Sequence, residues 1–410
     1  MRILVLNSGS SSLKFQVIET SPEQADRWED RLLAKGRVER IGSAGSMVVC
    51  QATGAEEVRY SEDVPDHRQA IAEALTWLKK SGVAAGASEI DGVGHRIVHG
   101  GEFFYESVRM DDGVVRQIEA CIELAPLHNP HNLKGYHAVR DLAPGMPQVA
   151  VFDTAFHHQM PARARLYAIP YVHYTRDHIR RYGFHGSSHR YVSRRFARID
   201  GRSIGELKLI SCHLGNGCSI CAIDRGRSVD TTMGFTPLEG LVMGTRSGDI
   251  DAGAVLHLGG KNGMSLRDLD VLLNQNSGLL GVSGISNDMR ELLAESDKGN
   301  ERARLAVELF CYRAKKYVGA YLAALGGADA VIFTGGIGEN APRVRGEIGS
   351  GLEPLGIRLD AARNDRALGT EAQISTDDSG VKLWVVPTNE EVVIARDTMR
   401  AIQGIPVSGA

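Results

Sequence analysis

The chain has few of the features that mark secreted, membrane-embedded or nucleic-acid-binding proteins. Its six cysteines in 410 residues argue against a disulfide scaffold and favour a reducing compartment. A formal net charge of −3 excludes a general attraction to nucleic acid or to an anionic membrane. No apolar run approaches a membrane span, and no basic region with an apolar segment behind it opens the chain. We therefore expect a cytoplasmic protein with no nucleic-acid or membrane partner.

Two of the cysteines, Cys218 and Cys221, match the C-x-x-C spacing of redox and zinc sites. They lie in a segment with the pattern of a strand, where residues three apart point to opposite faces. Such side chains neither pair nor bind one metal ion together. The sequence therefore disfavours a redox or zinc role.

Fourteen histidines raise the question of a transition-metal site. The pairs His95/His99 and His185/His189 have the spacing of ligands on a helix, but neither pair has the glutamate of the zinc-protease motif. The first pair also lies where a strand enters a glycine loop. We expect His95, His99 and His189 to be structural histidines with hydrogen-bond partners.

Length and composition set broad limits. A chain of 410 residues with 43% hydrophobic content is large enough for two or three domains with sizeable cores. Neither value distinguishes one function from another.

The N-terminal segment is the most informative part of the chain. The residues 3–6 and 13–18 have the pattern of two strands joined by a glycine-serine turn. We expect Gly9 to allow a tight turn and the turn's N–H and hydroxyl groups, with Lys14, to surround an anion such as phosphate. An ordinary hairpin with a polar turn would look the same when taken alone.

Two further glycine-rich elements favour a phosphate site over an ordinary hairpin. The segment 209–223 repeats the plan of strand, Gly/Asn/Ser turn and strand, and the segment 331–340 runs from an apolar strand through Gly-Gly-x-Gly into a predicted helix start. Two phosphate hairpins about two hundred residues apart indicate duplicated domains, which commonly bind ligand in the cleft between them.

Hydrophobic periodicity predicts the remaining main elements. We expect strands over 91–98 and 148–152. We expect helices over the ranges 69–80, 114–124, 303–325 and 389–402. Gly326 and Gly327 are placed to end the third of these helices.

Eight motifs together resemble the acetate kinase family, and the match runs nearly from end to end. They are Asn7-Ser-Gly-Ser-Ser-Ser-Leu-Lys14, Gly94-His-Arg-Ile-Val-His-Gly-Gly-Glu102, Ala125-Pro-Leu-His-Asn129, Phe152-Asp-Thr-Ala-Phe156, Tyr182-Gly-Phe-His-Gly-Ser-Ser-His189, Thr231-Thr-Met-Gly-Phe-Thr-Pro-Leu-Glu-Gly-Leu241, Gly244-Thr-Arg-Ser-Gly-Asp249 and Pro387-Thr-Asn-Glu-Glu391.

The resemblance implies an α/β fold of the superfamily of actin, sugar kinases and heat-shock ATPases. It has two duplicated ribonuclease-H-like domains, each with a mixed sheet flanked by helices, and an active-site cleft between them. We expect one domain over residues 1–154 completed by 388–410, and a nucleotide-binding domain over 155–387. The C-terminal helix should pack back on the first domain.

A carboxylate acceptor must be held and oriented, and the planar guanidinium of arginine suits that task. The resemblance points to Arg96 and Arg246, either of which could otherwise be an ordinary ion-pair partner. It also implies an acetate pocket lined by Val98, Leu127, Phe184 and Pro237.

Phosphoryl transfer depends mainly on positioning and on stabilising charge around the moving group. The resemblance assigns this to His185 and Arg246, with His128 as a second donor. Asp153 matches the family's catalytic aspartate, and it could orient the acetate, align the attacking oxygen or take part in proton transfer. A general base is not required, because the substrate carboxylate is already ionised near neutral pH.

The resemblance also implies residues for ATP and for Mg²⁺, with Mn²⁺ as a possible substitute. Asn7 and Glu390 match the family's metal pair, although the neighbouring Glu391 could take that place, and acidic residues at a helix start are also common without a metal. The residues implied for ATP or ADP are Ser10, Ser12, Lys14, His213, Leu214, Gly215, Asn216, Gly217, Asp288, Met289, Arg290, Gly336, Ile337, Gly338, Glu339 and Asn340.

The sequence thus predicts a homodimeric, magnesium-dependent enzyme that transfers the γ-phosphate of ATP to acetate by direct in-line transfer, giving acetyl phosphate and ADP. A propionate kinase is the nearest alternative, and a butyrate kinase fits the chain length less well. A nucleotide-binding module of the actin or chaperone type, without kinase activity, is the alternative from another class.

Overall fold

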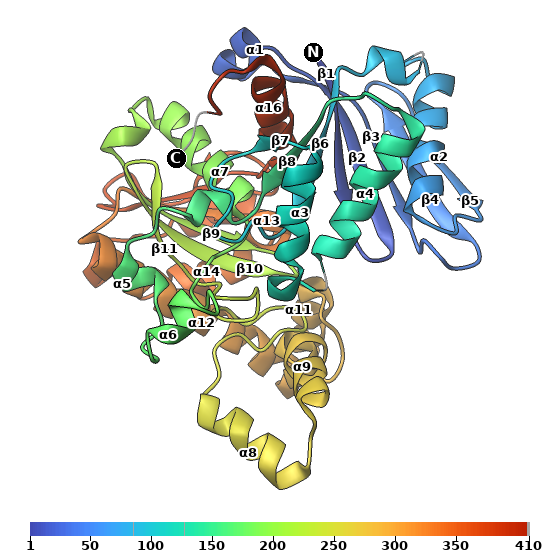
Figure 1. Cartoon of the computed structure of the whole chain (residues 1–410). Helices are drawn as coiled ribbons and strands as arrows, with labels where there is room; N and C mark the ends of the chain where they lie inside the picture. The colour runs from blue at the N-terminus through green and yellow to red at the C-terminus, as the bar shows by residue number, and fades with distance from the viewer. Residues whose placement is uncertain (85, 127, 408–410) are drawn as a thin grey trace. The chain divides into compact units, whose positions relative to one another are not determined.

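The computed structural model describes residues 1–84, 86–126 and 128–407 (Figure 1). The chain forms two compact units, which are described separately. The first contains Met1–Phe156 and Asn389–Gly409, and the second contains His157–Thr388. Compact units need not be the parts of a protein that fold or move as one body. The predicted domain limits, 1–154 with 388–410 and 155–387, therefore remain a prediction.

The first unit is built on an eight-stranded mixed sheet with the order β5-β4-β3-β2-β1-β6-β8-β7. Its strands are β1 Arg2–Ser8, β2 Ser12–Glu19, β3 Arg31–Glu39, β4 Ser46–Ala52, β5 Val58–Glu62, β6 Gly92–Ile97, β7 Val108–Arg109 and β8 Gln148–Phe152. β1 pairs antiparallel with β2, and it pairs parallel with β6. The predicted N-terminal hairpin is therefore confirmed, with Asn7 opposite Lys14.

Helices cover both faces of this sheet because β1 is apolar on both sides. Leu4 and Leu6 face a core shared with α2 and α4, whereas Ile3 and Val5 face a core shared with α16. The helices of the unit are α1 Pro22–Arg27, α2 His67–Lys80, α3 Asp112–Ala120, α4 Asn129–Leu142 and α16 Glu390–Gln403, with short 3₁₀ turns η1 Ala87–Glu89, η2 Ile122–Leu124 and η3 Ala155–His157, the last reaching into the second unit. The packing of the C-terminal helix on the first unit is as predicted.

The second unit has a six-stranded mixed sheet with the order β11-β10-β9-β12-β14-β13. Its strands are β9 Lys208–Leu214, β10 Cys218–Asp224, β11 Arg227–Thr231, β12 Ala330–Thr334, β13 Ala372–Gln373 and β14 Lys382–Val385. The second predicted hairpin is confirmed as β9 and β10, which pair antiparallel around Gly215–Gly217.

The described residues of this unit also form eleven helices and two 3₁₀ turns. They are α5 Ala162–Arg165, α6 Val172–Thr175, α7 Gly186–Asp200, η4 Ile204–Glu206, α8 Ala252–Asn262, α9 Leu266–Gln275, α10 Gly278–Ser283, α11 Met289–Asp297, α12 Glu301–Leu325, α13 Gly335–Asn340, α14 Pro342–Gly349, η5 Glu353–Leu355 and α15 Ala361–Arg366. α12 packs on β9 and β10 and ends as predicted at Gly326, which adopts the left-handed conformation with φ 66°.

The two sheets repeat one strand order. In the first, β3-β2-β1-β6-β8 has two antiparallel pairings followed by two parallel pairings. In the second, β11-β10-β9-β12-β14 has the same sequence of pairings. The predicted α/β fold with two duplicated mixed sheets flanked by helices is thus confirmed.

The helix expected over 114–124 begins earlier and ends earlier, because the Asp111 side chain caps it by accepting from Val114 N and because a separate 3₁₀ turn follows Cys121. The tight turn predicted at Gly9 is confirmed, since the Gly9 N–H donates to the Ser12 carbonyl at 2.8 Å without a left-handed φ. A Cβ there would lie 2.9 Å from Ser12 Oγ, so a larger residue would require that hydroxyl to move.

All six cysteines are free and buried. Burial raises the pKa of the Cys50, Cys121 and Cys218 thiols to about 12. Cys218 and Cys221 are therefore not disulfide-bonded. Among the described residues no helix combines the length and apolarity needed to cross a bilayer.

Candidate active site

In the first unit, Arg96 near the end of β6 forms a two-point ion pair with Asp153, which follows β8. Arg96 Nε lies 3.0 Å from Asp153 Oδ1, and Arg96 Nη2 lies 2.6 Å from Asp153 Oδ2. Burial acts to lower the pKa of the Arg96 guanidinium, but the negative charges of Asp153 and Glu390 raise it above its usual value. Arg96 is thus a fully charged group with a carboxylate already beside it.

Glu390, at the first turn of α16, is the unusual carboxyl group of this unit. Burial raises its pKa to about 7, with a further contribution from the charges of Asp153 and Glu391, while Arg96 and Lys14 act in the opposite direction. Its Oε2 atom is buried and has no hydrogen-bond partner among the described residues. A buried, unpartnered carboxylate oxygen is suited to a divalent cation, which prefers oxygen ligands.

The neighbouring Glu391 has different surroundings. It lines a cavity of about 260 Å³ together with Asn7 and Lys14, which face each other across the hairpin, and with Lys35 and Arg37. Lys14 and Ser10 are exposed, and Ser12 is half-buried. The described residues contain no group of three His, Cys, Asp or Glu side chains that could hold a metal ion by themselves. A cation here would have to share its coordination shell with substrate oxygens or water, as Mg²⁺ does.

Two asparagines of α4 hold the loop that follows Arg96. Asn132 Oδ1 accepts from Val98 N at 3.0 Å and its Nδ2 donates to Ser8 O at 2.8 Å, which ties the loop to the hairpin strand β1. Asn129 Oδ1 accepts from His99 N at 3.2 Å. Asn132 was not found by sequence reasoning, although it lies only three residues beyond a recognised motif. His128 precedes α4 in the same unit, and Leu127 lies outside the described residues.

In the second unit, His185 and Arg246 converge over the β9–β10 turn. A Cβ built on Gly217 would lie 3.5 Å from His185 Nε2 and 3.8 Å from Arg246 Nη1, so both side chains border the space above this glycine. His185 itself has φ 56°, an uncommon value for a residue with a side chain. Its ring stacks on that of His213 at 4.2 Å between centroids, and its Nδ1 lies 2.9 Å from Ser219 Oγ.

Arg246 differs from Arg96 in its neighbours. Its Nη1 donates to the Pro237 carbonyl at 3.2 Å, and no carboxylate in the described part of the unit forms an ion pair with it. Burial lowers the pKa of its guanidinium. A half-buried cation without a counter-charge favours the binding of an anion. Phe184, whose carbonyl faces His157 Nε2 at 2.9 Å, is buried just before His185.

The predicted histidines have partners, as expected for structural groups. His95 Nε2 lies 2.7 Å from Gln148 Oε1, and His189 lies within 2.9 Å of the Ser211 and Ser219 hydroxyls. Burial lowers the pKa of His95 to about 4 and that of His189 well below its usual value. The Nδ1 atom of His99 accepts from Gly101 N at 2.9 Å.

A cavity of about 640 Å³ in the second unit gathers the predicted nucleotide residues from three separate segments. Those that line it are Gly215, Asn216, Asp288, Met289, Arg290, Gly336, Ile337 and Asn340. Asn287, Leu293, Ala341, Pro342 and Arg343 complete the wall and were not found from the sequence. This volume is that of a small-molecule site.

The other predicted nucleotide residues of this unit support the cavity rather than line it. Leu214 and Gly338 are buried, and Glu339 Oε1 accepts from Gly335 N at 2.9 Å and from Thr388 N at 3.0 Å. His213 is the penultimate residue of β9, and its Nδ1 lies 2.8 Å from Ser188 Oγ. Arg345, which is fully buried and was also missed, donates to the carbonyls of Gly338 and Glu339.

Known proteins resemble the whole chain. An acetate kinase from Caldanaerobacter subterraneus subsp. tengcongensis is 53% identical over 408 residues, covering 99% of this chain and 100% of that protein. An acetate kinase from Chloroherpeton thalassium is 54% identical over 413 residues, covering 98% of this chain and 99% of that protein.

Solved structures agree. The crystal structure of Porphyromonas gingivalis acetate kinase has a TM-score of 0.92 at 46% identity, and a propionate kinase from Francisella tularensis subsp. tularensis SCHU S4 has 0.90 at 40% identity. Each alignment covers 98% of this chain and 99% of the solved one. The model of the acetokinase family matches residues 2–396, so the resemblance drawn from the motifs is confirmed and the chain belongs to the acetokinase family.

Proposed function

We propose that the chain catalyses the reversible transfer of the ATP γ-phosphoryl group to acetate, giving acetyl phosphate and ADP. The observation that carries this is the convergence of His185 and Arg246 over Gly217, with Arg246 half-buried and without a carboxylate partner. Two donors aimed at one point above a glycine turn suit a planar, highly charged phosphoryl group in its transition state. The acetate kinases that resemble the chain over nearly its full length support the same choice of substrates.

The acceptor would be bound by the two arginines. Arg246 supplies an uncompensated positive charge, and Arg96 supplies a guanidinium oriented by Asp153. The residues proposed for the methyl pocket are Val98, two residues after Arg96, and Phe184 and Pro237, beside His185 and Arg246. Leu127, proposed for the same pocket, lies outside the described residues. A planar fork that pairs with a carboxylate fixes the direction of its attacking oxygen.

The remaining catalytic roles follow from chemistry. His185 and His128 would donate hydrogen bonds to the moving phosphoryl oxygens, and Arg246 would neutralise the charge that develops there. Asp153 would hold Arg96 and the acetate in line, because an ionised carboxylate acceptor has no proton to remove. No covalent enzyme intermediate is required.

ATP would occupy the 640 Å³ cavity with its outer phosphates toward the Gly215–Gly217 turn, and Ser10, Ser12 and Lys14 would contact phosphate from the first hairpin. The donor set of Asn7 and Glu390 fits Mg²⁺, and also Mn²⁺, since both supply oxygen atoms and one Glu390 oxygen lacks a partner. When bound, such an ion would neutralise phosphate charge and orient the nucleotide. We propose further that the enzyme is a cytoplasmic homodimer.

A hydroxamate-trapping assay with ATP and acetate, propionate or butyrate tests the function, because hydroxylamine captures acyl phosphates. We expect the highest kcat/KM with acetate and a lower value with propionate. Equal or better use of propionate would make the chain a propionate kinase like the Francisella relative. ATP turnover that does not depend on any short carboxylate would instead indicate a nucleotide-binding module.

Transfer from a chiral thiophosphate-labelled ATP tests the direct mechanism. One in-line displacement inverts the configuration at phosphorus, so we expect inversion. Net retention would require an even number of displacements, and thus a phosphorylated enzyme group such as Asp153 or Glu390.

A further inference from the structure

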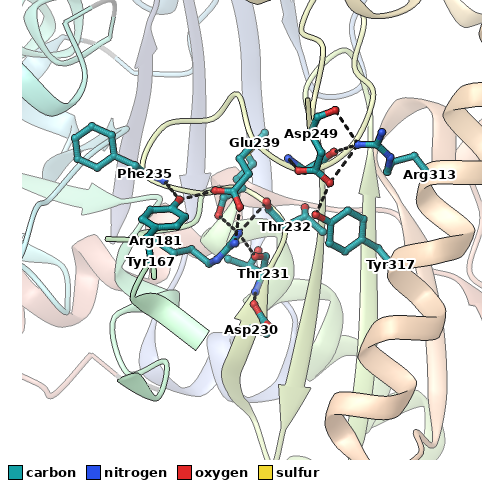
Figure 2. Close-up of polar contacts among 12 residues, drawn as sticks. Tyr167, Arg181, Asp230, Thr231, Thr232, Phe235, Glu239, Asp249, Arg313 and Tyr317 are labelled. Atoms are coloured by element: carbon teal, nitrogen blue, oxygen red, sulfur yellow. Dashed lines mark hydrogen bonds and ion pairs between the residues drawn. The ribbon is translucent and has the colours of Figure 1, made fainter. Parts of the chain in front are cut away.

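A polar cluster of half-buried side chains in the second unit lies outside all of the predicted site residues. It consists of Tyr167, Arg181 and Glu239, which Figure 2 shows pointing toward one another. Arg181 Nη2 lies 2.6 Å from Glu239 Oε1, and the Tyr167 hydroxyl donates to Glu239 Oε2. Burial and the Glu239 charge raise the pKa of the Tyr167 hydroxyl, which therefore remains a donor at neutral pH.

The cluster fixes the backbone of the loop that leaves β11. Arg181 Nη1 donates to three successive carbonyls, those of Thr231, Thr232 and Met233, at 2.8, 3.0 and 3.3 Å. The Tyr167 oxygen in turn accepts from Phe235 N at 2.9 Å. One guanidinium and one phenol thus hold residues 231–235 (Figure 2).

The same loop is joined to the segment that carries His185. The Gly234 carbonyl accepts from Tyr182 N at 3.0 Å and from Gly183 N at 3.3 Å. Gly234 is required for this contact, since a Cβ there would lie 1.8 Å from Glu239 Oε2 and 2.3 Å from the Tyr167 oxygen. Arg181 itself is four residues before His185, so the cluster fixes both the loop and the start of the histidine segment.

A second set of contacts fixes the chain just after Arg246. Asp249 Oδ1 accepts from Gly240 N at 2.8 Å, and its Oδ2 lies 2.7 Å from the Tyr317 hydroxyl and 3.1 Å from Arg313 Nη1 (Figure 2). Tyr317 and Arg313 belong to α12, the longest helix of the unit. The chain is therefore anchored at Glu239 and again at Asp249, and the stretch between the anchors contains Arg246.

The ion pairs in these two sets of contacts explain why the charge of Arg246 is available to a ligand. Arg181 has Glu239 and Arg313 has Asp249 as carboxylate partners, whereas the bond from Arg246 Nη1 is to the Pro237 carbonyl. Arg181 and Arg313 are thus each neutralised by their own carboxylate, and the positive charge of Arg246 is left for a ligand. We propose that Tyr167, Arg181 and Glu239 are positioning residues that hold Pro237 and Arg246 against the histidine segment in the geometry needed for transfer. The inference rests on the proposed kinase function.

Steady-state kinetics of Tyr167→Phe test this role, because the variant keeps the ring and loses only the hydroxyl. We expect kcat to fall by about 10- to 100-fold, since small misplacements of a binding group cost this much. The KM for acetate should rise about threefold and that for ATP should stay within about twofold, because the nucleotide cavity is untouched. Glu239→Gln should act in the same direction, and Arg181→Lys should retain more activity than Arg181→Ala.

Glu371→Gln is the matched control. Glu371, just before β13, pairs with Arg195 of α7 through two bonds in the same unit, at 2.5 and 2.8 Å. This variant should keep the wild-type kcat and acetate KM. A Tyr167→Phe enzyme that behaves like the control, with a lowered Tm and unchanged kinetics, would mean that the cluster serves stability alone.

The decisive measurement combines Tyr167→Phe with Arg246→Ala. If the cluster acts through Arg246, the hydroxyl loss should change kcat by less than about twofold in the Arg246→Ala background, because effects of residues acting as a unit are not additive. The same large loss in both backgrounds would overturn the inference. Absence of acyl phosphate formation by the wild-type enzyme would instead overturn the proposed function, so the two failures are distinguishable.

Discussion

Arg96 and Arg246 have the same side chain and the same proposed ligand, yet their surroundings are opposite. Arg96 is bonded at two points to Asp153, whereas Arg246 contacts a backbone carbonyl and has its guanidinium pKa lowered by burial. A paired arginine is oriented but electrostatically satisfied. An unpaired, half-buried arginine is a latent anion site. The comparison suggests that Arg96 mainly sets direction and Arg246 mainly supplies charge.

The largest expected effect comes from removing the unpaired cation. Arg246→Ala should lower kcat by about 10³-fold, the magnitude typical for loss of a transition-state donor, with a smaller change in the KM for ATP. Arg202→Ala, which removes an exposed arginine of the same unit, should leave kcat unchanged. Equal kcat losses for Arg246→Ala and Arg96→Ala, with equal changes in acetate KM, would erase the proposed difference.

Asp153→Asn would make Arg96 resemble Arg246 by removing its counter-charge. We expect kcat to fall about 100-fold because the acceptor is no longer held in line, while the KM for acetate stays the same or decreases. Initial-rate kinetics in the direction of acetyl phosphate formation measure both values.

Asp30→Asn is the matched control for that variant, since Asp30 pairs with Arg396 in the same unit and is equally buried. It should change stability without changing kcat. A raised acetate KM in Asp153→Asn would show instead that Asp153, rather than Arg96, sets substrate affinity.

The third prediction concerns Glu390, whose pKa is raised to about 7 by burial. Below pH 7 its neutral form dominates, and a metal ion must displace the proton, so the Mg²⁺ concentration for half-maximal rate should rise about tenfold for each unit below pH 7. Above pH 8 this dependence should disappear. Glu390→Gln should require about tenfold more Mg²⁺ at pH 8 and lose the pH dependence.

The Glu391→Gln variant tests which of the two adjacent glutamates binds the metal ion. Glu391 lines the cavity with Asn7 and Lys14, whereas Glu390 has a buried oxygen without a hydrogen-bond partner among the described residues. A larger increase in the Mg²⁺ concentration for half-maximal rate in Glu391→Gln than in Glu390→Gln would identify Glu391 as the metal ligand.

The smallest effect is expected at Val98, close to the paired arginine. Val98→Ala should narrow the preference for acetate over propionate by several-fold, since one methylene is worth about 1–3 kcal/mol of discrimination. The ratio of the two kcat/KM values from the hydroxamate assay measures this. An unchanged ratio would place the methyl pocket elsewhere.

Sequence reasoning found the features that are local in the chain. The two hairpins, the long α12 and the C-terminal α16 each follow from apolar periodicity interrupted by glycine or asparagine, and they are confirmed. The end of α3 was wrong because an apolar period cannot distinguish a final α turn from a 3₁₀ turn. The tight turn predicted at Gly9 is confirmed, since the Gly9 N–H donates to the Ser12 carbonyl at 2.8 Å.

What the sequence could not predict depends on contacts between distant residues. Tyr167, Arg181 and Glu239 are separated by up to 72 positions, and each alone resembles an ordinary surface group. The roles of Asn132 and Arg345 likewise depend on hydrogen bonds to backbone groups of other segments, which the sequence does not reveal. The residues of the 640 Å³ cavity were mostly found, because the glycine elements over 209–223 and 331–340 contribute to its wall and the family resemblance pointed to residues 288–290.

The burial of all six thiols has a practical consequence. Alkylating reagents and fluorescent maleimides need an accessible thiolate, and none of the native cysteines offers one at neutral pH. A single cysteine introduced on the surface of each unit would therefore be the principal point of labelling, without prior removal of native residues. The chain is in this sense ready for spectroscopic distance measurements that follow its two units during turnover.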